Sequence, residues 1–270
     1  MTIGSYEDRF SGIARLVGVS GAERLRGAHV AIVGIGGVGS WTVEALARSG
    51  VGTLTLIDLD EVCINNANRQ LHALDTTVGR AKVEVMAERV RLIQPSCHVR
   101  AVQDFFTAKT AESLLGDDVD VVVDAIDSAR NKALLIAMCR RRGLPVIVCG
   151  GAGGRLDPGQ IHVCDLNRTN GDALLRSVRD LLRKEHGLPR NPKWQVSTIC
   201  STEPAKWPTV DGETRPTGRG FRLDCTTGYG AASFVTGTMG FMAAALATRL
   251  IIEGPPQAAQ APVALAIDER

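Results

Sequence analysis

The sequence predicts an α/β fold, a Rossmann-like doubly wound and mainly parallel sheet with a C-terminal extension and a long crossover loop. Three observations carry this prediction. From residue 28 onward, short apolar segments alternate with amphipathic ones. Several of the short segments, such as 121–123, are apolar at every position, which is typical of strands covered on both faces. A glycine-rich turn at 34–39 joins the first apolar run to a helix-like segment.

The expected elements follow in order along the chain. Strands are predicted at 28–34, 52–58, 97–102, 118–126 and 144–150, with one more at 159–166. Helices are predicted at 38–49, 78–94, 128–142 and 172–186, with stop signals such as Gly50 and Pro95 behind the first two. Residues 202–220 are rich in Pro, Gly and charge and read as a long mobile connection.

Composition places the chain among ordinary globular proteins. It has 270 residues, of which 44% are hydrophobic and 22% charged, and a net charge of +2. A balance this mild is compatible with a nucleic-acid partner but does not indicate one. The seven cysteines form no CxxC pair, so we expect reduced thiols in a cytoplasmic protein and no structural zinc site built from such pairs.

One segment raises the question of a membrane. Residues 231–252 contain a single charge, Arg249, and reach the length of a spanning helix. Much of the segment is Ala, Gly, Ser and Thr, which suit tight packing against another helix. The N-terminus also lacks the pattern of a secretion signal. We therefore expect a buried helix, no membrane insertion and a cytoplasmic location.

The glycine-rich turn predicts nucleotide binding. Gly34 permits a tight turn, Gly36 and Gly37 let the backbone approach a phosphate, and Gly39 lets the helix pack onto its strand. The helix behind the turn offers unpaired N–H groups to an anion. A glycine motif alone does not distinguish NAD from ATP.

An acidic residue is expected to bind the ribose. Asp58 ends the second predicted strand, where such motifs place a carboxylate for a ribose hydroxyl. Asp60 is the competing ribose partner, because the pleat points both side chains the same way.

Further polar residues favour phosphate chemistry on ATP. Arg69 and Lys82 could clamp phosphates from two sides, with the amide of Asn66 assisting. Asp124 and Asp127 lie where the strand at 118–126 ends, the edge of an open α/β sheet at which ligands bind. A carboxylate facing a nucleoside triphosphate is a natural Mg²⁺ ligand. Each of these residues could instead have an ordinary structural role. Asp127, for example, could cap the next helix.

These motifs are similar to those of a known superfamily. The segments GIGGVGS, LIDLDEV, NNANRQ, VGRAKVE and DAIDS resemble the adenylating domain of the ubiquitin-activating-enzyme superfamily, ThiF and MoeB types included. The resemblance implies ATP and Mg²⁺ as cofactors and an acyl-adenylate intermediate. It places Asp58 at the ribose, Asn66, Arg69 and Lys82 at the phosphates, and Asp127 on the magnesium side. Arg69, Lys82 and Asp127 are thereby the candidate catalytic residues.

A narrower resemblance covers nearly the whole chain. RFSGIARLVG, NRQLHAL, CRRRGLPVIVCGGAGGRLDP, STEP and LDCTTGYGAA resemble the family of tRNA threonylcarbamoyladenosine dehydratases. This implies a homodimer that uses ATP to activate the carboxylate of threonylcarbamoyladenosine beside the tRNA anticodon. The carbamoyl group then closes a ring, with net loss of water. Superfamily members often send an N-terminal arginine into the partner's ATP site, and Arg15 is the candidate here, although its spacing departs from the general pattern.

Cys225 and two basic segments complete the candidate residues. Cys225 precedes a predicted helix and is a candidate reactive or sulfur-accepting thiol, with a sulfur-relay protein as a candidate partner, but a buried structural role is an equal alternative. Residues 168–193 carry an excess of basic residues and are a candidate tRNA contact, with 140–142 as a second patch.

The chain is accordingly divided into four parts. These are an N-terminal helical arm (1–27), a Rossmann-like core for ATP binding and adenylation (28–166), a C-terminal portion for substrate and dimerisation (167–255, with the mobile loop at about 202–220), and a tail expected to be disordered (256–270). Two other functions stay open at this point: an adenylyltransferase for a ubiquitin-like or sulfur-carrier protein, and an NAD-linked oxidoreductase.

Overall fold

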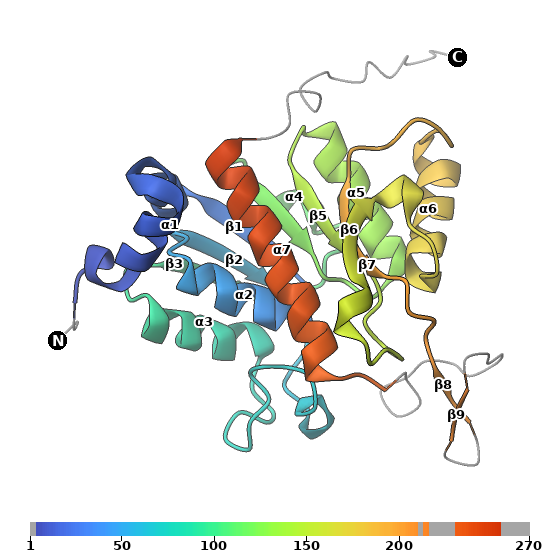
Figure 1. Cartoon of the computed structure of the whole chain (residues 1–270), viewed down its shortest axis with the longest axis horizontal. Coiled ribbons are helices and arrows are strands. Elements are labelled where there is room, and N and C mark those ends of the chain that lie inside the picture. The colour runs from blue at the N-terminus through green and yellow to red at the C-terminus, as the bar shows by residue number, and fades with distance from the viewer. Residues whose placement is uncertain (1–3, 210–212, 216–229, 255–270) are drawn as a thin grey trace.

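The computed structural model describes residues 4–209, 213–215 and 230–254, and its centre is a twisted seven-stranded sheet (Figure 1). The strand order is β3-β2-β1-β4-β5-β7-β6. Neighbouring strands are parallel except β6 and β7, which are antiparallel. The predicted fold class is confirmed.

The bounds of the elements agree with most of the expected segments. The sheet strands are β1 His29–Val33, β2 Thr53–Ile57, β3 His98–Val102, β4 Val121–Asp124, β5 Val146–Cys149, β6 Ile161–Asp165 and β7 Ser197–Ser201. The α-helices are α1 Tyr6–Gly27, α2 Gly39–Arg48, α3 Lys82–Ile93, α4 Ala111–Leu114, α5 Ala129–Arg141, α6 Ala173–His186 and α7 Ser233–Glu253. Short 3₁₀ turns are η1 Ile64–Asn66, η2 Pro158–Gln160 and η3 Leu166–Arg168.

Helices cover both faces of the sheet. One core contains residues of α2, α3 and α7, and the other contains residues of α5 and α6. The central strands β1 and β4 are buried at every position, which explains their continuous apolar sequence. Two opposite layers of helices on one mostly parallel sheet are the doubly wound architecture.

Three parts of the chain differ from the sequence prediction. The helix expected at 78–94 begins only at Lys82, because Gly79 donates to the carbonyl of Val62 at 2.8 Å and Ala81 pairs with Glu61, which holds this stretch extended. β7 was not predicted, and it lies between β5 and β6, so residues on both sides of position 166 share one sheet. Within the expected loop 202–220, β8 (Trp207–Pro208) and β9 (Thr214–Arg215) form a small antiparallel ribbon.

Helix α7 packs across the sheet beside α2 (Figure 1). Small residues permit this contact, since a Cβ on Gly240 would lie 2.6 Å from the carbonyl oxygen of Val38. The expected packing against another helix is therefore present. α7 is long and apolar enough to cross a membrane, and 44% of its apolar window is buried in the fold. Its other face is open, with Phe234 and Phe241 about half exposed.

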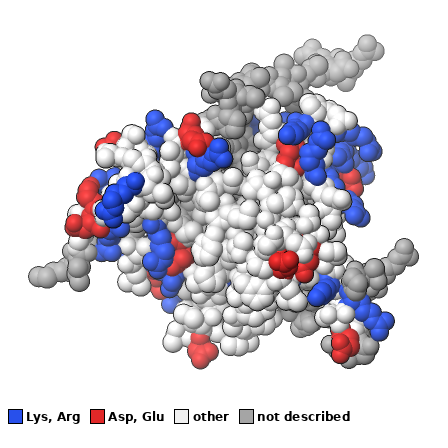
Figure 2. All heavy atoms as spheres, in the orientation of Figure 1, with Lys and Arg blue, Asp and Glu red and all other residues white. Residues whose placement is uncertain are grey.

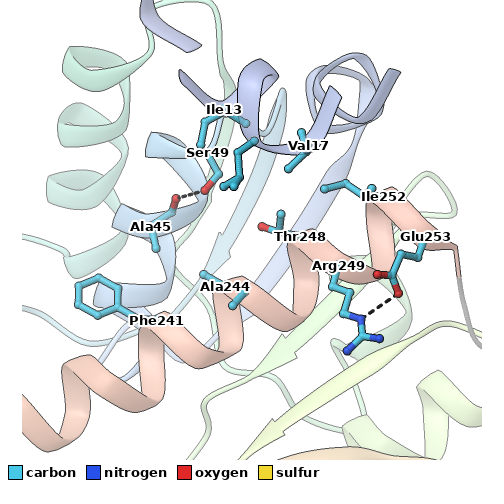
Figure 3. Close-up of a pocket in the computed structure, with 12 residues that line it drawn as sticks. Ile13, Val17, Ala45, Ser49, Phe241, Ala244, Thr248, Arg249, Ile252 and Glu253 are labelled. Carbon is cyan, nitrogen blue, oxygen red and sulfur yellow. Dashed lines mark hydrogen bonds and ion pairs between the residues drawn. The ribbon is translucent and has the colours of Figure 1, made fainter. Parts of the chain in front are cut away.

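An apolar groove of about 440 Å³ lies between α1, α2 and α7. Figure 3 shows Ile13 and Val17 of α1 facing Ala244 and Thr248 of α7 across this groove. Its α2 residues come from the C-terminal half of that helix. The groove therefore lies at the opposite end of α2 from the glycine turn.

Candidate functional site at the carboxyl ends of the central strands

The glycine turn follows β1 and is closed by two close backbone contacts. Gly34 has φ +92°, and a Cβ there would lie 2.7 Å from the carbonyl oxygen of Ala125. A Cβ on Gly39 would lie only 1.8 Å from the carbonyl oxygen of Gly34. Both positions therefore require glycine, and both bring the turn against the loop that follows β4.

The turn lies at the topological switch point of the sheet. From β1 the chain continues to β2 on one side, and from β4 it continues to β5 on the other. In open α/β sheets this crevice is where ligands bind. A Cβ on Gly36 would meet only Gln70 Nε2, at 3.9 Å, so space above Gly36 is open. The N-cap of α2, Val38, makes no side-chain cap bond, which leaves this helix end suited to an anion.

The Asp58 side chain is hydrogen-bonded to the backbone of the glycine turn. Its Oδ2 accepts from the Ile35 N–H at 2.6 Å and its Oδ1 from the Asp60 N–H at 2.9 Å. Burial raises the pKa of Asp58, and the positive charge of Lys82 opposes this shift. The carboxylate thus shapes the glycine turn, and its contact with a ribose stays a prediction.

Lys82 lies at the start of α3 and points to the same edge of the sheet. It is 5% exposed, and its Nζ lies 2.8 Å from Asp60 Oδ2. The Asp60 side chain is 59% exposed, so one end of this ion pair is open to solvent. In the structure Asp60 is the lysine's partner, while Asp58 holds the glycine turn.

Arg69 lies alongside the glycine turn. A Cβ on Gly37 would lie 3.5 Å from Arg69 Cγ, so the stem of the arginine covers this glycine. The Arg69 guanidinium donates to the carbonyl oxygen of Asn65 at 2.9 Å and to Asn68 Oδ1 at 2.8 Å. Both acceptors are exposed and uncharged, so the guanidinium can exchange them for a phosphate oxygen at modest cost.

Asn66 is more constrained than Arg69. It is 7% exposed, its Oδ1 accepts from the Cys63 N–H at 3.1 Å and its Nδ2 donates to Asn65 Oδ1 at 2.9 Å. These bonds stabilise the turn η1. The predicted phosphate contact of Asn66 would require its amide group to leave a partner within its own turn.

The loop after β4 contains one exposed and one buried carboxylate. Asp127 is exposed, and the N-cap of α5 is Ser128 rather than Asp127. Asp124 is fully buried, and its Oδ1 lies 2.8 Å from Lys132 Nζ, which is also fully buried. Asp127 is thus the acidic group free to face a ligand, and Asp124 fixes the loop.

Lys132 was not identified from the sequence. It shares the buried face of α5 with Leu135, Ile136 and Cys139, at helical spacing. A lysine on an otherwise apolar helical face, eight residues after a strand-terminal aspartate, is the signal that could have revealed this pair.

His72 and Gln70 were also missed. His72 is 1% exposed and its Nε2 donates to the carbonyl oxygen of Ile35 at 2.8 Å, so it holds the glycine turn from the side. Burial lowers the pKa of His72, which keeps the ring neutral. Gln70 is buried beside Gly36, and its Oε1 has no hydrogen-bond partner among the described residues.

Helix α7 contributes to the site although it lies far along the chain. Thr236 of α7 and Trp41 of α2 both donate to the carbonyl oxygen of Arg69, at 3.3 Å and 3.1 Å. A Cβ on Gly37 would lie 3.1 Å from Thr236 Cγ2. The amino end of α7 therefore fixes the backbone of Arg69 over the glycine turn.

Arg15 lies away from the glycine turn, on α1. Arg15 is exposed on α1, and this helix packs on the turn after α2, where Tyr6 Oη donates to the Gly50 carbonyl at 2.7 Å. The contact of Arg15 with a partner's ATP site stays a prediction. Cys225 lies outside the described residues.

Basic side chains gather on one side of the molecule (Figure 2). Figure 2 shows Lys and Arg at the upper right, where Figure 1 places α6. Arg176 and Lys184 of α6 are exposed. In the second predicted patch, Arg140 donates to the carbonyl of Trp194 and Arg142 to the carbonyls of Leu115 and Gly116. These two arginines therefore have structural roles in the fold.

Comparisons with known proteins agree with this fold. A model of the ThiF family matches residues 10–269. The tRNA threonylcarbamoyladenosine dehydratase of Haemophilus influenzae is 47% identical over 89% of this chain and 92% of its own length. A crystal structure of the Escherichia coli tRNA N6-threonylcarbamoyladenosine dehydratase in complex with ATP has a TM-score of 0.82 and 43% identity, covering 94% of this chain and 98% of that one. A complex of the same enzyme with AMP has a TM-score of 0.84 and 44% identity, with the same coverage.

Proposed function

The chain belongs to the ThiF family, and on that premise we propose that it is an ATP-dependent tRNA threonylcarbamoyladenosine dehydratase. One observation carries the proposal. The glycine turn, with the stem of Arg69 beside it, lies against the loop after β4 that carries the exposed Asp127, in a chain that is similar over 94% of its length to a dehydratase crystallised with ATP.

We infer a binding mode that these positions support. The phosphates would lie on the open backbone at Gly36 and the amino end of α2, with Arg69 and Lys82 on two sides and Asn66 beside them. The ribose would take the acidic side, at Asp58 or Asp60. Asp127, with phosphate oxygens, offers the all-oxygen donor set that Mg²⁺ prefers. When bound, Mg²⁺ would neutralise phosphate charge, and Asp127 would hold it there.

The proposed reaction has two steps, and ATP is consumed in the first. A carboxylate oxygen of threonylcarbamoyladenosine attacks the α-phosphorus, the bond to the β-phosphate oxygen breaks, and pyrophosphate leaves. The carbamoyl group then attacks the acyl carbon, AMP leaves, and one proton is lost to solvent. Because the nucleophile is already part of the substrate, the second step is intramolecular and needs no cysteine. Arg69 and Lys82 stabilise the charge that builds on phosphate in the first step.

Assembly and location are also part of the proposal. Leu16 and Val19 of α1 are 79% and 71% exposed, and Phe241 borders the apolar groove at 50% exposure. A homodimer formed through this face would cover them and bring α1, with Arg15, to a second subunit. Size-exclusion chromatography with light scattering tests the dimer, and Leu16→Lys should shift it towards the monomer. A tRNA substrate would place the protein in the cytoplasm.

The decisive experiment supplies ATP, Mg²⁺ and tRNA that carries threonylcarbamoyladenosine. Mass spectrometry of nucleosides released under mild conditions should show loss of one water from the modified base, together with one AMP. Arg69→Ala should abolish this loss, whereas Arg80→Ala, an exposed arginine paired with Glu88, should not. ATP–pyrophosphate exchange driven instead by a small protein with a C-terminal glycine would overturn the proposal.

A further inference from the structure

Three metal-ligating side chains meet at the far edge of the sheet. His162 and Cys164 belong to β6 and Cys200 belongs to β7. Cys200 Sγ lies 3.4 Å from Cys164 Sγ and 3.5 Å from His162 Nε2, and all three atoms lie within 4.8 Å of one another. Three strands, β4, β5 and β7, separate β6 from β1 in the sheet, so this cluster is distinct from the glycine turn.

The strand register explains why these residues meet. His162 and Cys164 are two apart on β6, so the pleat points them to the same face. Cys200 pairs directly with His162 across the antiparallel ladder, and therefore also points to that face. The cluster rests on a backbone ladder rather than on a loop, which fixes its geometry.

The register also argues against a disulfide. The ladder partner of Cys164 is Thr198, so Cys164 and Cys200 are diagonal neighbours. Diagonal pairs have Cα atoms roughly 7–8 Å apart, beyond the range that a disulfide usually spans. An atom placed between the two sulfurs, however, can bond to both.

We propose that His162, Cys164 and Cys200 bind one Zn²⁺ ion. With Zn–S bonds of about 2.3 Å and Zn–N bonds of about 2.0 Å, tetrahedral ligand atoms lie about 3.5–3.8 Å apart. The observed 3.4 Å and 3.5 Å are already close to this spacing. Water would supply the fourth ligand, since His162 and Cys164 are only partly buried. Binding displaces the two thiol protons to solvent, with no change of oxidation state.

The second ring nitrogen of His162 supports this assignment. His162 Nδ1 lies 3.4 Å from the carbonyl oxygen of Gln160, which favours the tautomer with the proton on Nδ1. That tautomer leaves the lone pair of Nε2 directed at Cys200. Ligating histidines commonly have a carbonyl at the other nitrogen. The bound ion would fasten the edge strand β6 to β7.

Metal titration of the full-length protein tests the proposal. The protein is stripped with a chelator under reducing conditions and titrated with Zn²⁺, and separately with Co²⁺ as a spectroscopic probe. We expect one tight equivalent of Zn²⁺, a rise in Tm on binding, and a Co²⁺ spectrum with tetrahedral visible bands and a thiolate charge-transfer band. His162→Gln and Cys164→Ser should each weaken binding by more than about 100-fold, since each removes a direct ligand.

A control variant separates this cluster from another thiol. Cys63 is exposed and is the N-cap of η1, so Cys63→Ser should keep the tight equivalent. Equal Zn²⁺ affinity in His162→Gln and the unchanged protein would overturn the proposal, as would loss of binding in Cys63→Ser. His162 is partly exposed, so His162→Gln keeps the test valid even if a cysteine variant fails to fold. The readout involves neither ATP nor tRNA, so its result is independent of the proposed function.

Discussion

Two lysine–aspartate ion pairs flank the glycine turn, and they differ in burial rather than in distance. Lys132–Asp124 and Lys82–Asp60 each have an N–O separation of 2.8 Å. Both members of the first pair are fully buried, whereas the Asp60 side chain is 59% exposed. The same contact therefore has two different physical consequences.

A buried pair cannot change partners cheaply, because each charge has given up its hydration. Asp124 also accepts from the Ile126 N–H at 3.1 Å, so this pair fixes the loop that carries Asp127. Asp60 can return to water at little cost, which leaves Lys82 free to turn towards a phosphate. Burial thus separates a pair that fixes the loop after β4 from a pair whose lysine we propose to take part in the reaction.

The largest expected effect is on the buried pair. Lys132→Met leaves Asp124 buried and unpaired, and should lower the free energy of unfolding by about 3–5 kcal/mol. Urea unfolding followed by circular dichroism measures this change. A double variant, Lys132→Met with Asp124→Leu, should recover part of the loss. If Lys132→Met costs no more than Lys82→Met, burial does not distinguish the two pairs.

The exposed pair should show the opposite pattern. Lys82→Met should lower the rate of the adenylation step by roughly 10²–10³-fold, the cost of removing one donor to a developing charge. Its unfolding free energy should change by less than about 1.5 kcal/mol, because Asp60 remains hydrated. Single-turnover release of pyrophosphate measures the rate, with Arg80→Met as the control for a lost exposed charge. A normal rate in Lys82→Met would exclude this lysine from the reaction.

The sequence was sufficient for six of the seven strands of the sheet, but not for β7. Continuous apolar runs predicted β1 and β4, and the glycine turn and Asp127 follow the ends of these two strands. Local pattern was enough there, because the motif residues are close to the strands that position them.

Residues that depend on strand pairing or packing could not be predicted in this way. β7 has only five residues with serine at both ends, so its apolar signal is weak. The contact of Cys200 with His162 depends on the β6–β7 register, which no spacing along the chain specifies. Lys132 required knowledge of which face of α5 is buried.

His72 is also buried and basic, but its ring is neutral in the fold and gains a proton only at low pH, so this residue makes stability depend on pH. Because burial lowers its folded pKa below the ordinary 6.5, its contribution to stability is complete above that pH and is lost as pH falls towards the folded pKa. Between pH 7.5 and 5.5 we expect stability to fall, by no more than about 1.4 kcal/mol per pH unit from this group. His72→Gln, whose amide can still donate to Ile35, should flatten this slope in urea unfolding. An unchanged slope would assign the pH dependence to other groups.

We expect the smallest effect, a weaker binding of tRNA, from substitutions of exposed charged side chains. Arg176 and Lys184 are exposed on α6, so each should contribute mainly a phosphate contact to tRNA binding. Arg176→Ala and Lys184→Ala should weaken binding similarly for all tRNA sequences and reduce the slope of log K against log salt by about 1 each. A filter-binding salt titration measures this slope, with Arg80→Ala on α3's side of the molecule as the control. If all three variants give the same slope, the tRNA binds on another surface. A variant that has lost a phosphate contact releases fewer counterions on binding, so its slope must be smaller.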